Sequence, residues 1–195
     1  MSSTYLVTND GYDFKWLALQ VDDFISLLPE SYSDIEIFQF SYHNLSFAPW
    51  WNNMQSRFVQ SEDSLSLPIP DISLWLPGAA LVLSTRAYDA LLGAIADFGE
   101  LLPVSCQGET YYIFNCLTLG EVDEKGSKYI VDEGVILGVE SMKFDQKDVG
   151  DKIIFKTTFN RCTDLYCNST FKNIVESHNL TGITFKTDLL SVIDD

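Results

Sequence analysis

The clearest pattern of apolar positions predicts a helix over residues 84–98. Its core-facing stripe recurs every three or four residues: Ala87, Leu91, Ile95 and Phe98. Ser84 precedes the stripe, and its hydroxyl can accept the free amide hydrogens of a first helical turn. Gly99 follows the stripe, where a left-handed glycine commonly ends a helix. We therefore expect a core-facing helix that Ser84 caps and Gly99 closes.

A second helical pattern lies near the C-terminus. Asn168 or Ser169 can cap its first turn, and Asn179 can close its last turn. The residues at helical spacing that are expected to face inward are Phe171, Ile174, Val175 and His178. The sequence thus predicts two main helices.

The remaining apolar segments are short and bounded by turn residues, which is typical of β-strands. Before the first helix, these segments cover residues 4–7, 14–21, 35–40 and 81–83. After it, they cover residues 101–104, 111–117, 128–131, 134–139, 153–158 and 180–185. Strands that mostly follow one another, with two helices interspersed, predict an α+β fold with a largely antiparallel mixed sheet.

Composition suggests one internal boundary. Residues 61–70 form a polar connector with two prolines, and each proline biases the residue before it towards an extended backbone. We therefore expect an acidic strand and loop region over residues 1–69, packed on an α+β domain over residues 70–195. A chain of 195 residues suits one compact unit of this kind.

The charge of the chain limits its partners. There are 28 acidic and 12 basic residues, which gives a formal net charge of −16. The acidic surplus is densest in the first third, where Lys15 and Arg57 are the only basic residues among the first seventy-five. A negative field disfavours nucleic acids and anionic membranes, and it speeds encounters with basic proteins. Plain solubility is the alternative interpretation of the same charge.

The N-terminal residues lack the basic region and long apolar run of a secretion signal, and no segment approaches 18 continuous apolar residues. We therefore expect a cytoplasmic location with reduced thiols and no membrane partner. Cys162 and Cys167 resemble half of a metal site, but His43 and His178 fit no standard ligand spacing. All four cysteines are better interpreted as buried free thiols.

Candidate catalytic groups are few. His178 could pair with Cys162 or Cys167, but no family-type signature surrounds either thiol. Adjacent carboxylates in strands point to opposite faces, and those in turns usually face water. The sequence contains no phosphate-binding glycine loop, no GxSxG elbow and no HExxH motif. It therefore predicts no catalytic residue, no cofactor and no metal site.

A partner-binding surface is the remaining candidate. Trp50 and Trp51 are adjacent in a loop, so in an extended backbone both side chains cannot point into one core. Tryptophan is also strongly enriched among interface anchors. The acidic residues expected to steer a basic partner to this surface are Asp22, Asp23, Glu62 and Asp63. The alternative is that one or both indoles cover the protein's own core.

Several short motifs follow one another in a fixed order over residues 70–195. They are Ser84-x-x-Ala87-x-x-x-Leu91, Glu100–Val104, Tyr111-Tyr112-x-x-Asn115, Asp123 with Ser127, Phe155-Lys156, and Phe171 to Phe185. This order resembles immunity protein family eleven, a bacterial family encoded beside polymorphic toxins. The leucine usual after Val122-Asp123 is absent, so that turn is expected to differ. Over residues 1–69 the resemblance amounts to little beyond aromatic strands.

The resemblance implies a non-enzymatic antitoxin that binds and neutralises a cognate toxin encoded by an adjacent gene. The charge of −16 would suit a basic toxin, such as a nuclease whose nucleic-acid groove an acidic surface could block. Two other classes stay open: an acidic adaptor or nucleic-acid mimic unrelated to toxins, and a small hydrolase. Replacing the two histidines and four cysteines separates the antitoxin from the hydrolase, since a folded binder would keep its affinity and an enzyme that uses these groups would lose activity. An adaptor or mimic would instead have a partner that is not toxic when expressed alone.

Overall fold

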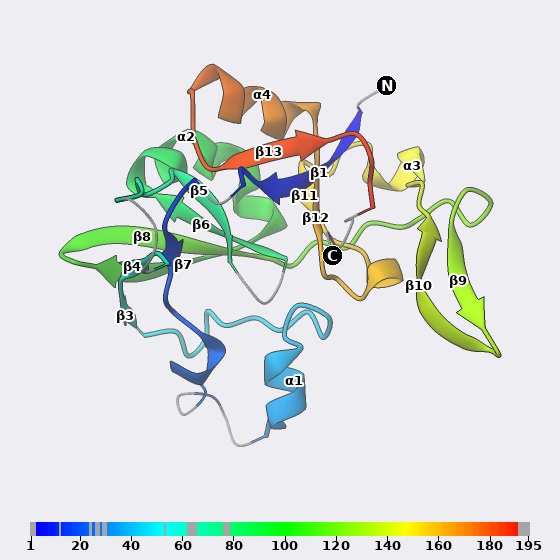
Figure 1. Ribbon diagram of the computed structural model, residues 1–195, viewed down its shortest axis with the longest axis horizontal. Coiled ribbons are helices and arrows are strands. Elements are labelled where there is room, and N and C mark those ends of the chain that lie inside the picture. Colours follow the sequence, from blue (N-terminus) through cyan, green and yellow to red (C-terminus); the bar gives the residue numbers. More distant parts are fainter. Residues whose placement is uncertain are drawn as a thin grey trace.

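The computed structural model describes residues 3–11, 13–23, 25, 28, 31–52, 54–61, 66–75 and 79–190. Within these ranges the protein is α+β, with mostly antiparallel sheets and two helices of seven residues or more. The predicted fold class is therefore confirmed. Figure 1 shows the strands and the two longer helices gathered in one body, from which a two-stranded hairpin projects.

The larger sheet has the strand order β3-β7-β8-β6-β5. Its strands are Met54–Ser56 (β3), Gly99–Cys106 (β7), Glu109–Cys116 (β8), Ala80–Ser84 (β6) and Ile72–Trp75 (β5). All neighbours are antiparallel except β3 and β7, which pair in parallel. The strands predicted at 81–83, 101–104 and 111–117 coincide with β6, β7 and β8 and are confirmed.

The second sheet has the order β11-β12-β1-β13. Its strands are Ile154–Phe155 (β11), Leu165–Asn168 (β12), Thr4–Asn9 (β1) and Ile183–Lys186 (β13). Strand β1 lies inside this sheet, where Leu6 faces Tyr166 of β12 and also pairs with Lys186 of β13. The N-terminal strand is therefore an internal strand of a sheet that the C-terminal third otherwise forms.

Helices α2 (Thr85–Ile95) and α4 (Ser169–Ser177) lie together on one side of the body and contact each other (Figure 1). Their inward residues share one core with both sheets: Ala87, Leu91, Ile95, Phe171 and Val175, with Val7, Leu81, Phe114 and Leu165. This shared core explains the helical spacing seen in the sequence, because each stripe faces apolar side chains of the strands.

The helix starts and the end of α4 follow the predicted caps. Ser84 Oγ accepts a hydrogen bond from the amide of Ala87 (3.2 Å), and Asn168 Oδ1 accepts one from the amide of Thr170 (2.8 Å). Asn179 has a left-handed φ of 49°, and its amide donates to the carbonyl oxygen of Glu176 (3.1 Å). The caps are satisfied by the residue types that prefer these positions.

Two helix predictions are wrong. Gly99 has an extended φ of 179° and begins β7, after a short 3-10 turn at Ala96–Phe98. A Cβ at position 99 would lie 2.3 Å from the carbonyl oxygen of Asn115, so glycine is needed for the close approach of β7 and β8. His178 is exposed at the C-cap of α4 and does not face the core.

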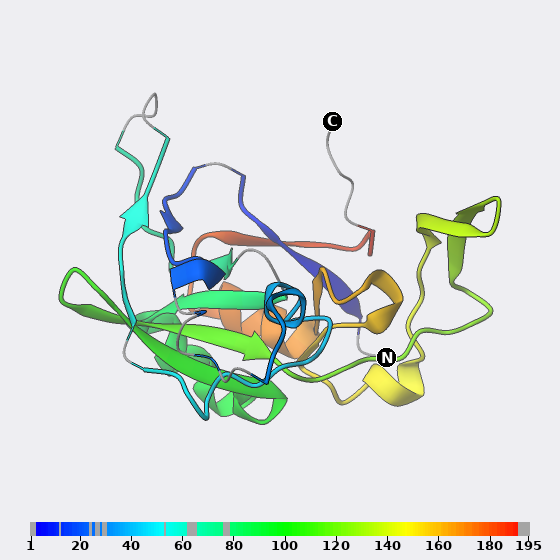
Figure 2. The same cartoon turned by 90° about the horizontal axis from the view of Figure 1, so that it is seen from below.

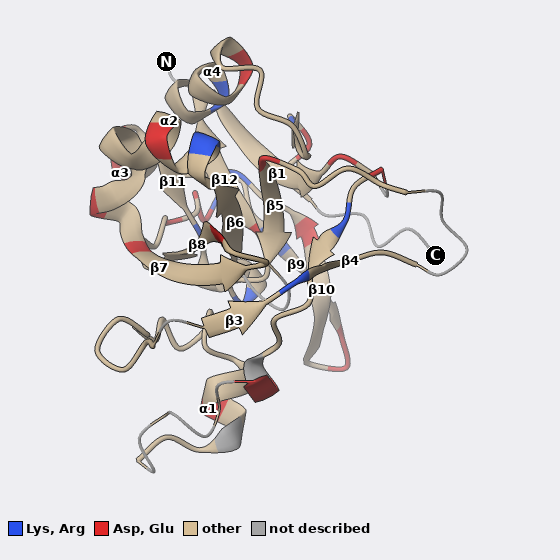
Figure 3. Cartoon of the chain, turned by 90° about the vertical axis from the view of Figure 1, so that its left-hand side faces the viewer, with Lys and Arg blue, Asp and Glu red and all other residues tan. Residues whose placement is uncertain are grey.

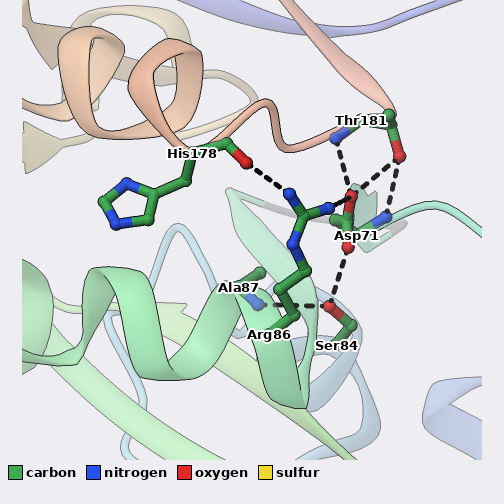
Figure 4. Close-up of polar contacts among 6 residues, drawn as sticks. All are labelled: Asp71, Ser84, Arg86, Ala87, His178 and Thr181. Carbon is green, nitrogen blue, oxygen red and sulfur yellow. Dashed lines mark hydrogen bonds and ion pairs between the residues drawn. The ribbon is translucent and has the colours of Figure 1, made fainter.

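The carboxylate of Asp71 bonds residues at the start of α2 and after the end of α4 (Figure 4). Asp71 accepts hydrogen bonds from the amide and hydroxyl of Thr181, both at 3.0 Å, and forms an ion pair with Arg86 at 3.1 Å. Arg86 also donates to the carbonyl oxygen of His178, and Ser84 Oγ donates to Asp71 at 3.4 Å. The start of α2 is thereby tied to the end of α4.

Three predicted strands differ from the structure. Residues 35–40 contain helix α1 (Asp34–Phe38), because Ser33 and Glu36 form a capping box in which each side chain bonds the other's amide. The predicted strand at 14–21 is reduced to β2 (Trp16–Leu17), which pairs with β4 (Phe58–Val59). The strand predicted at 153–158 is reduced to β11, and a 3-10 turn follows at Thr158–Asn160.

The Glu100 carboxylate fastens the loop after α1 to the larger sheet. It accepts hydrogen bonds from Ser46 Oγ (2.7 Å), from the amides of Phe47 (2.6 Å) and Ala48 (3.1 Å), and from Asn115 Nδ2 (2.8 Å). Asn115 Nδ2 donates to the carbonyl oxygen of Leu45 as well (2.9 Å). Phe47 is thereby held in the core that also contains residues of α1, β3, β4, β6, β7 and β8.

A buried lysine fastens the same region from the other side. Lys156 is fully buried, and its Nζ donates to the carbonyl oxygen of Ser41 at 2.6 Å. Ser41 Oγ donates to the carbonyl oxygen of Cys162 (3.0 Å) and accepts from the amide of Ala79 (3.2 Å). Burial lowers the pKa of the Lys156 ammonium.

Replacing Glu100 tests this attachment. The Glu100→Ala variant leaves the amides of Phe47 and Ala48 without this acceptor, and Asn115 Nδ2 keeps only its bond to Leu45. We expect the free energy of unfolding in urea to fall by about 3 kcal/mol. Glu121→Ala removes an exposed carboxylate and is the control, with an expected change of about 0.5 kcal/mol or less. Equal effects of the two substitutions would contradict the role assigned to Glu100.

Candidate functional site

The two adjacent tryptophans both lie against the protein's own core. The ring centroid of Phe47 is 5.0 Å from that of Trp50 and 6.3 Å from that of Trp51, whose Nε1 donates to the carbonyl oxygen of Pro103 (2.8 Å). The structure agrees with the alternative in which the indoles cover the protein's own core, because the backbone turns at residues 48–50 and is not extended there. Both indoles are half-buried, so each keeps an exposed part.

Of the acidic residues predicted to steer a partner, the structure describes Asp22 and Asp23. Asp22 and Asp23 are exposed in a 3-10 turn, where Asp23 Oδ2 accepts from the amide of Gln20 (2.7 Å). Glu62 and Asp63 lie outside the described residues. Figure 3 shows acidic residues spread over α1, α2, α4 and the turn of the projecting hairpin. Toxin contact by these carboxylates and by Trp50 and Trp51 stays a prediction.

The projecting hairpin carries a surface that the sequence patterns did not single out. Strands β9 (Lys128–Asp132) and β10 (Val135–Ser141) confirm the strands predicted at 128–131 and 134–139. Five of their apolar side chains are between 48% and 64% exposed: Ile130, Val131, Val135, Ile136 and Leu137. Figures 1 and 2 both show this hairpin standing away from the body. Exposed apolar side chains gathered on one element commonly mark an interaction surface.

A cleft of about 530 Å³ lies between this hairpin and the body. Its hairpin wall includes Ile136 and Leu137, and its opposite wall includes Tyr42 and the 3-10 turn at Thr158–Asn160. Tyr129 of β9 stacks on Phe159 at a centroid distance of 4.1 Å, which anchors the hairpin to the body. The lining is mixed, with no cluster of catalytic groups among the described residues.

The base of the hairpin is held by Asp123 and Ser127. Ser127 Oγ accepts from the amide of Lys143 (3.0 Å) and donates to its carbonyl oxygen (3.1 Å). Asp123 forms an ion pair with Lys143 at 3.5 Å, and the amide of Lys125 holds the pKa of the Asp123 carboxyl below its usual value. These contacts join the turn at residues 123–127 to Lys143 and so hold the base of the hairpin.

The four cysteine thiols differ from catalytic cysteines in their burial and in their pKa. All four are free and buried, as predicted. Burial raises the pKa of Cys106 to about 11 and that of Cys116 to about 12, whereas a nucleophilic cysteine needs a lowered pKa. The exposed His178 has its Nδ1 2.9 Å from the carbonyl oxygen of Ile174. Among the described residues there is no group of three His, Cys, Asp or Glu side chains that could hold a metal ion.

The helices of the described part of the chain are all too short or too polar to cross a membrane.

The raised thiol pKa values make stability depend on pH. The Cys106 pKa in the folded protein is about 11, above its usual value of 9.0, so its stabilising contribution is complete below that usual value and is lost as the pH rises further. We expect the free energy of unfolding in urea to fall by about 1 kcal/mol through this thiol between about pH 8 and about pH 10. The Cys106→Ala variant should lose correspondingly less over the same interval. Because Lys156 contributes with the opposite sign, the difference between the two proteins is the measurement, and identical pH profiles would contradict the prediction.

Comparison with known proteins gives one family. Residues 101–188, from β7 to the end of β13, match the immunity protein family Imm11. A comparison with curated proteins found no match. The matched region contains Asp123, Ser127 and the whole β9–β10 hairpin. Members of this family are not enzymes, and membership implies the neutralisation of a cognate toxin. The chain therefore carries an Imm11 immunity protein family domain over residues 101–188.

Proposed function

We propose that this protein neutralises a basic toxin domain of the nuclease type by binding it in the cytoplasm of the cell that produces both. The observation that carries the toxin class is the formal charge of −16. A nuclease needs a positively charged groove for its nucleic acid, and an acidic protein is electrostatically complementary to such a groove.

The acidic side chains of the described residues support this proposal. Most of them lie at the surface, among them Asp89, Asp97, Asp132, Glu133 and Glu140. The ion pairs found in the described part of the chain each join one acidic and one basic side chain, so they leave the acidic surplus in place. Such a surplus raises the rate at which a basic partner is encountered and lowers it for anionic partners.

The toxin function is tested with the adjacent reading frame. Expressed alone, the adjacent gene is expected to stop growth, and co-expression of this chain is expected to restore growth and to yield a complex that copurifies. An unrelated acidic protein of similar size and charge is the control, and it should not restore growth. If neither neighbouring gene is toxic, the proposal that this chain neutralises an adjacent toxin fails.

The toxin class is tested separately by salt. The dissociation constant of the complex is expected to rise at least about tenfold between about 50 mM and about 500 mM salt, because screening weakens the attraction between exposed charges. The free toxin should cleave DNA or RNA, and the complex should not. A dissociation constant that does not change with salt would contradict the basic-toxin proposal while leaving neutralisation itself intact.

A further inference from the structure

The β9–β10 hairpin exposes apolar side chains on both of its faces. The strand register places Ile136 opposite Val131 and Val139 opposite Tyr129, so these four residues share one face. Ile130 and Val135 neighbour Val131 and Ile136 in sequence and therefore lie on the other face. The first face borders the cleft, and the second faces away from it. Contact with the body therefore cannot cover both faces.

The edges of the hairpin are open as well. Strands β9 and β10 pair only with each other among the described strands, so each has one unpaired edge. The register of β10 is interrupted between Ile136 and Gly138 and again between Val139 and Ser141. Irregularities of this kind discourage simple strand addition along an edge. A partner would therefore meet this hairpin mainly through its side chains.

The hairpin is held in place before any partner arrives. Its turn has left-handed φ angles at Glu133 (46°) and Gly134 (84°), which matches the turn preferred by tight hairpins. Its base is fixed by the hydrogen bonds between Ser127 and Lys143, and its first strand is fixed by the stacking of Tyr129 on Phe159. A preorganised apolar element loses little conformational entropy on binding.

Two kinds of partner could cover this hairpin: a second copy of this chain or a basic protein. Their charges distinguish between them. The hairpin carries one basic residue, Lys128, and three acidic residues: Asp132, Glu133 and Glu140. A second copy would bring like charges together and would carry the same net charge of −16. A basic partner would instead pair with the acidic turn while its apolar groups cover Val135 and Leu137.

We infer that the β9–β10 hairpin is the main toxin-contacting element, and that it inserts into an apolar cleft of the toxin whose rim is basic. This inference rests on the proposed function, since the toxin is the partner. Exposed valine and leucine side chains supply the buried contact, and the turn carboxylates meet the basic rim. The hairpin therefore provides the anchor residues, and the remaining acidic surface guides the approach.

The test measures toxin affinity of hairpin variants that should fold normally. The first variant combines Val131→Ser, Val135→Ser and Leu137→Ser, all at side chains that are more than half exposed. We expect its dissociation constant to rise about 100-fold, mainly through faster dissociation. The matched control combines Ile35→Ser, Ile69→Ser and Leu92→Ser, which are exposed apolar residues on other elements, and it should bind like the wild type.

The contribution of the turn carboxylates is measured with a second pair of variants. Asp132→Asn with Glu133→Asn removes both charges, and asparagine keeps the left-handed conformation at position 133. We expect about tenfold weaker binding at low salt, mainly through slower association. Asp89→Asn with Asp97→Asn removes the same charge from α2 and the turn after it, and should have a smaller effect.

The possible results of these measurements lead to different conclusions. A serine variant that binds within about threefold of the wild type while remaining folded would overturn the hairpin assignment. Stronger loss from Asp22→Asn than from the hairpin variants would also overturn it, in favour of the N-terminal surface. If the wild type binds no toxin from either neighbouring gene, the proposed function itself fails. A wild-type dimer that the serine variant abolishes, with unchanged toxin affinity, would assign the hairpin to a second copy and overturn the inference.

A second measurement does not depend on multiple substitutions. Hydrogen exchange of the wild-type complex should show slowed exchange over residues 128–141 relative to the free protein. Leu137→Lys alone places a charge at a side chain that is 64% exposed, so the free protein tolerates it whereas an apolar cleft would not. Unchanged exchange over the hairpin on toxin binding would overturn the inference.

Discussion

The rest of the structure depends on one half-buried carboxylate, that of Glu100. A loop whose amides point into a protein core is stable only if those amides find acceptors, and Glu100 supplies acceptors to Phe47 and Ala48 at once. Asn115, on the neighbouring strand, joins the same network and also holds the carbonyl oxygen of Leu45. Because Phe47 is then fixed, Trp50 and Trp51 can pack on it, and the loop after α1 becomes part of the wall of the larger sheet.

Polar contacts of this kind also distinguish the frame of the protein, meaning its bonded sheets, helices and loops, from its exposed surface. Two polar side chains of the frame bond residues far away in the sequence: Lys156 bonds Ser41, and Asp71 bonds Thr181. The β9–β10 hairpin differs from this frame. Hydrogen bonds hold its base, whereas its apolar side chains contact little of the body. Two-stranded ribbons are seldom stable alone, so the bonds of Ser127 to Lys143 and the stacking of Tyr129 on Phe159 hold this surface in place.

Features that depend on residues close in sequence were predicted correctly. Ser84, Asn168 and Asn179 were identified as helix-capping residues because their roles depend on residues close in sequence, and the α+β class followed from the order of the elements. Helix α1 was predicted as a strand because the apolar residues over 35–40 resemble a short strand, whereas the capping box of Ser33 and Glu36 starts a helix there. The extended Gly99 and the shared packing of Trp50 and Trp51 depend on Asn115 and Phe47, which lie far away in sequence or across a turn, so no local pattern reveals them. The exposure of Val135 and Leu137 could not be predicted either, since the pattern of apolar residues is the same whether a strand faces a core or water.

In the proposed complex with a toxin, acidity and exposed apolar side chains have different roles. Long-range attraction raises the association rate and is screened by salt, whereas buried valine and leucine contacts slow dissociation and are little affected by salt. Spreading carboxylates over several elements serves the first task without fixing a contact geometry. Gathering apolar side chains on one braced hairpin serves the second, because a preorganised anchor keeps most of its burial energy as affinity. The braced hairpin therefore offers rigid side chains that can be fitted to one toxin, and it lies within the residues that match the Imm11 family.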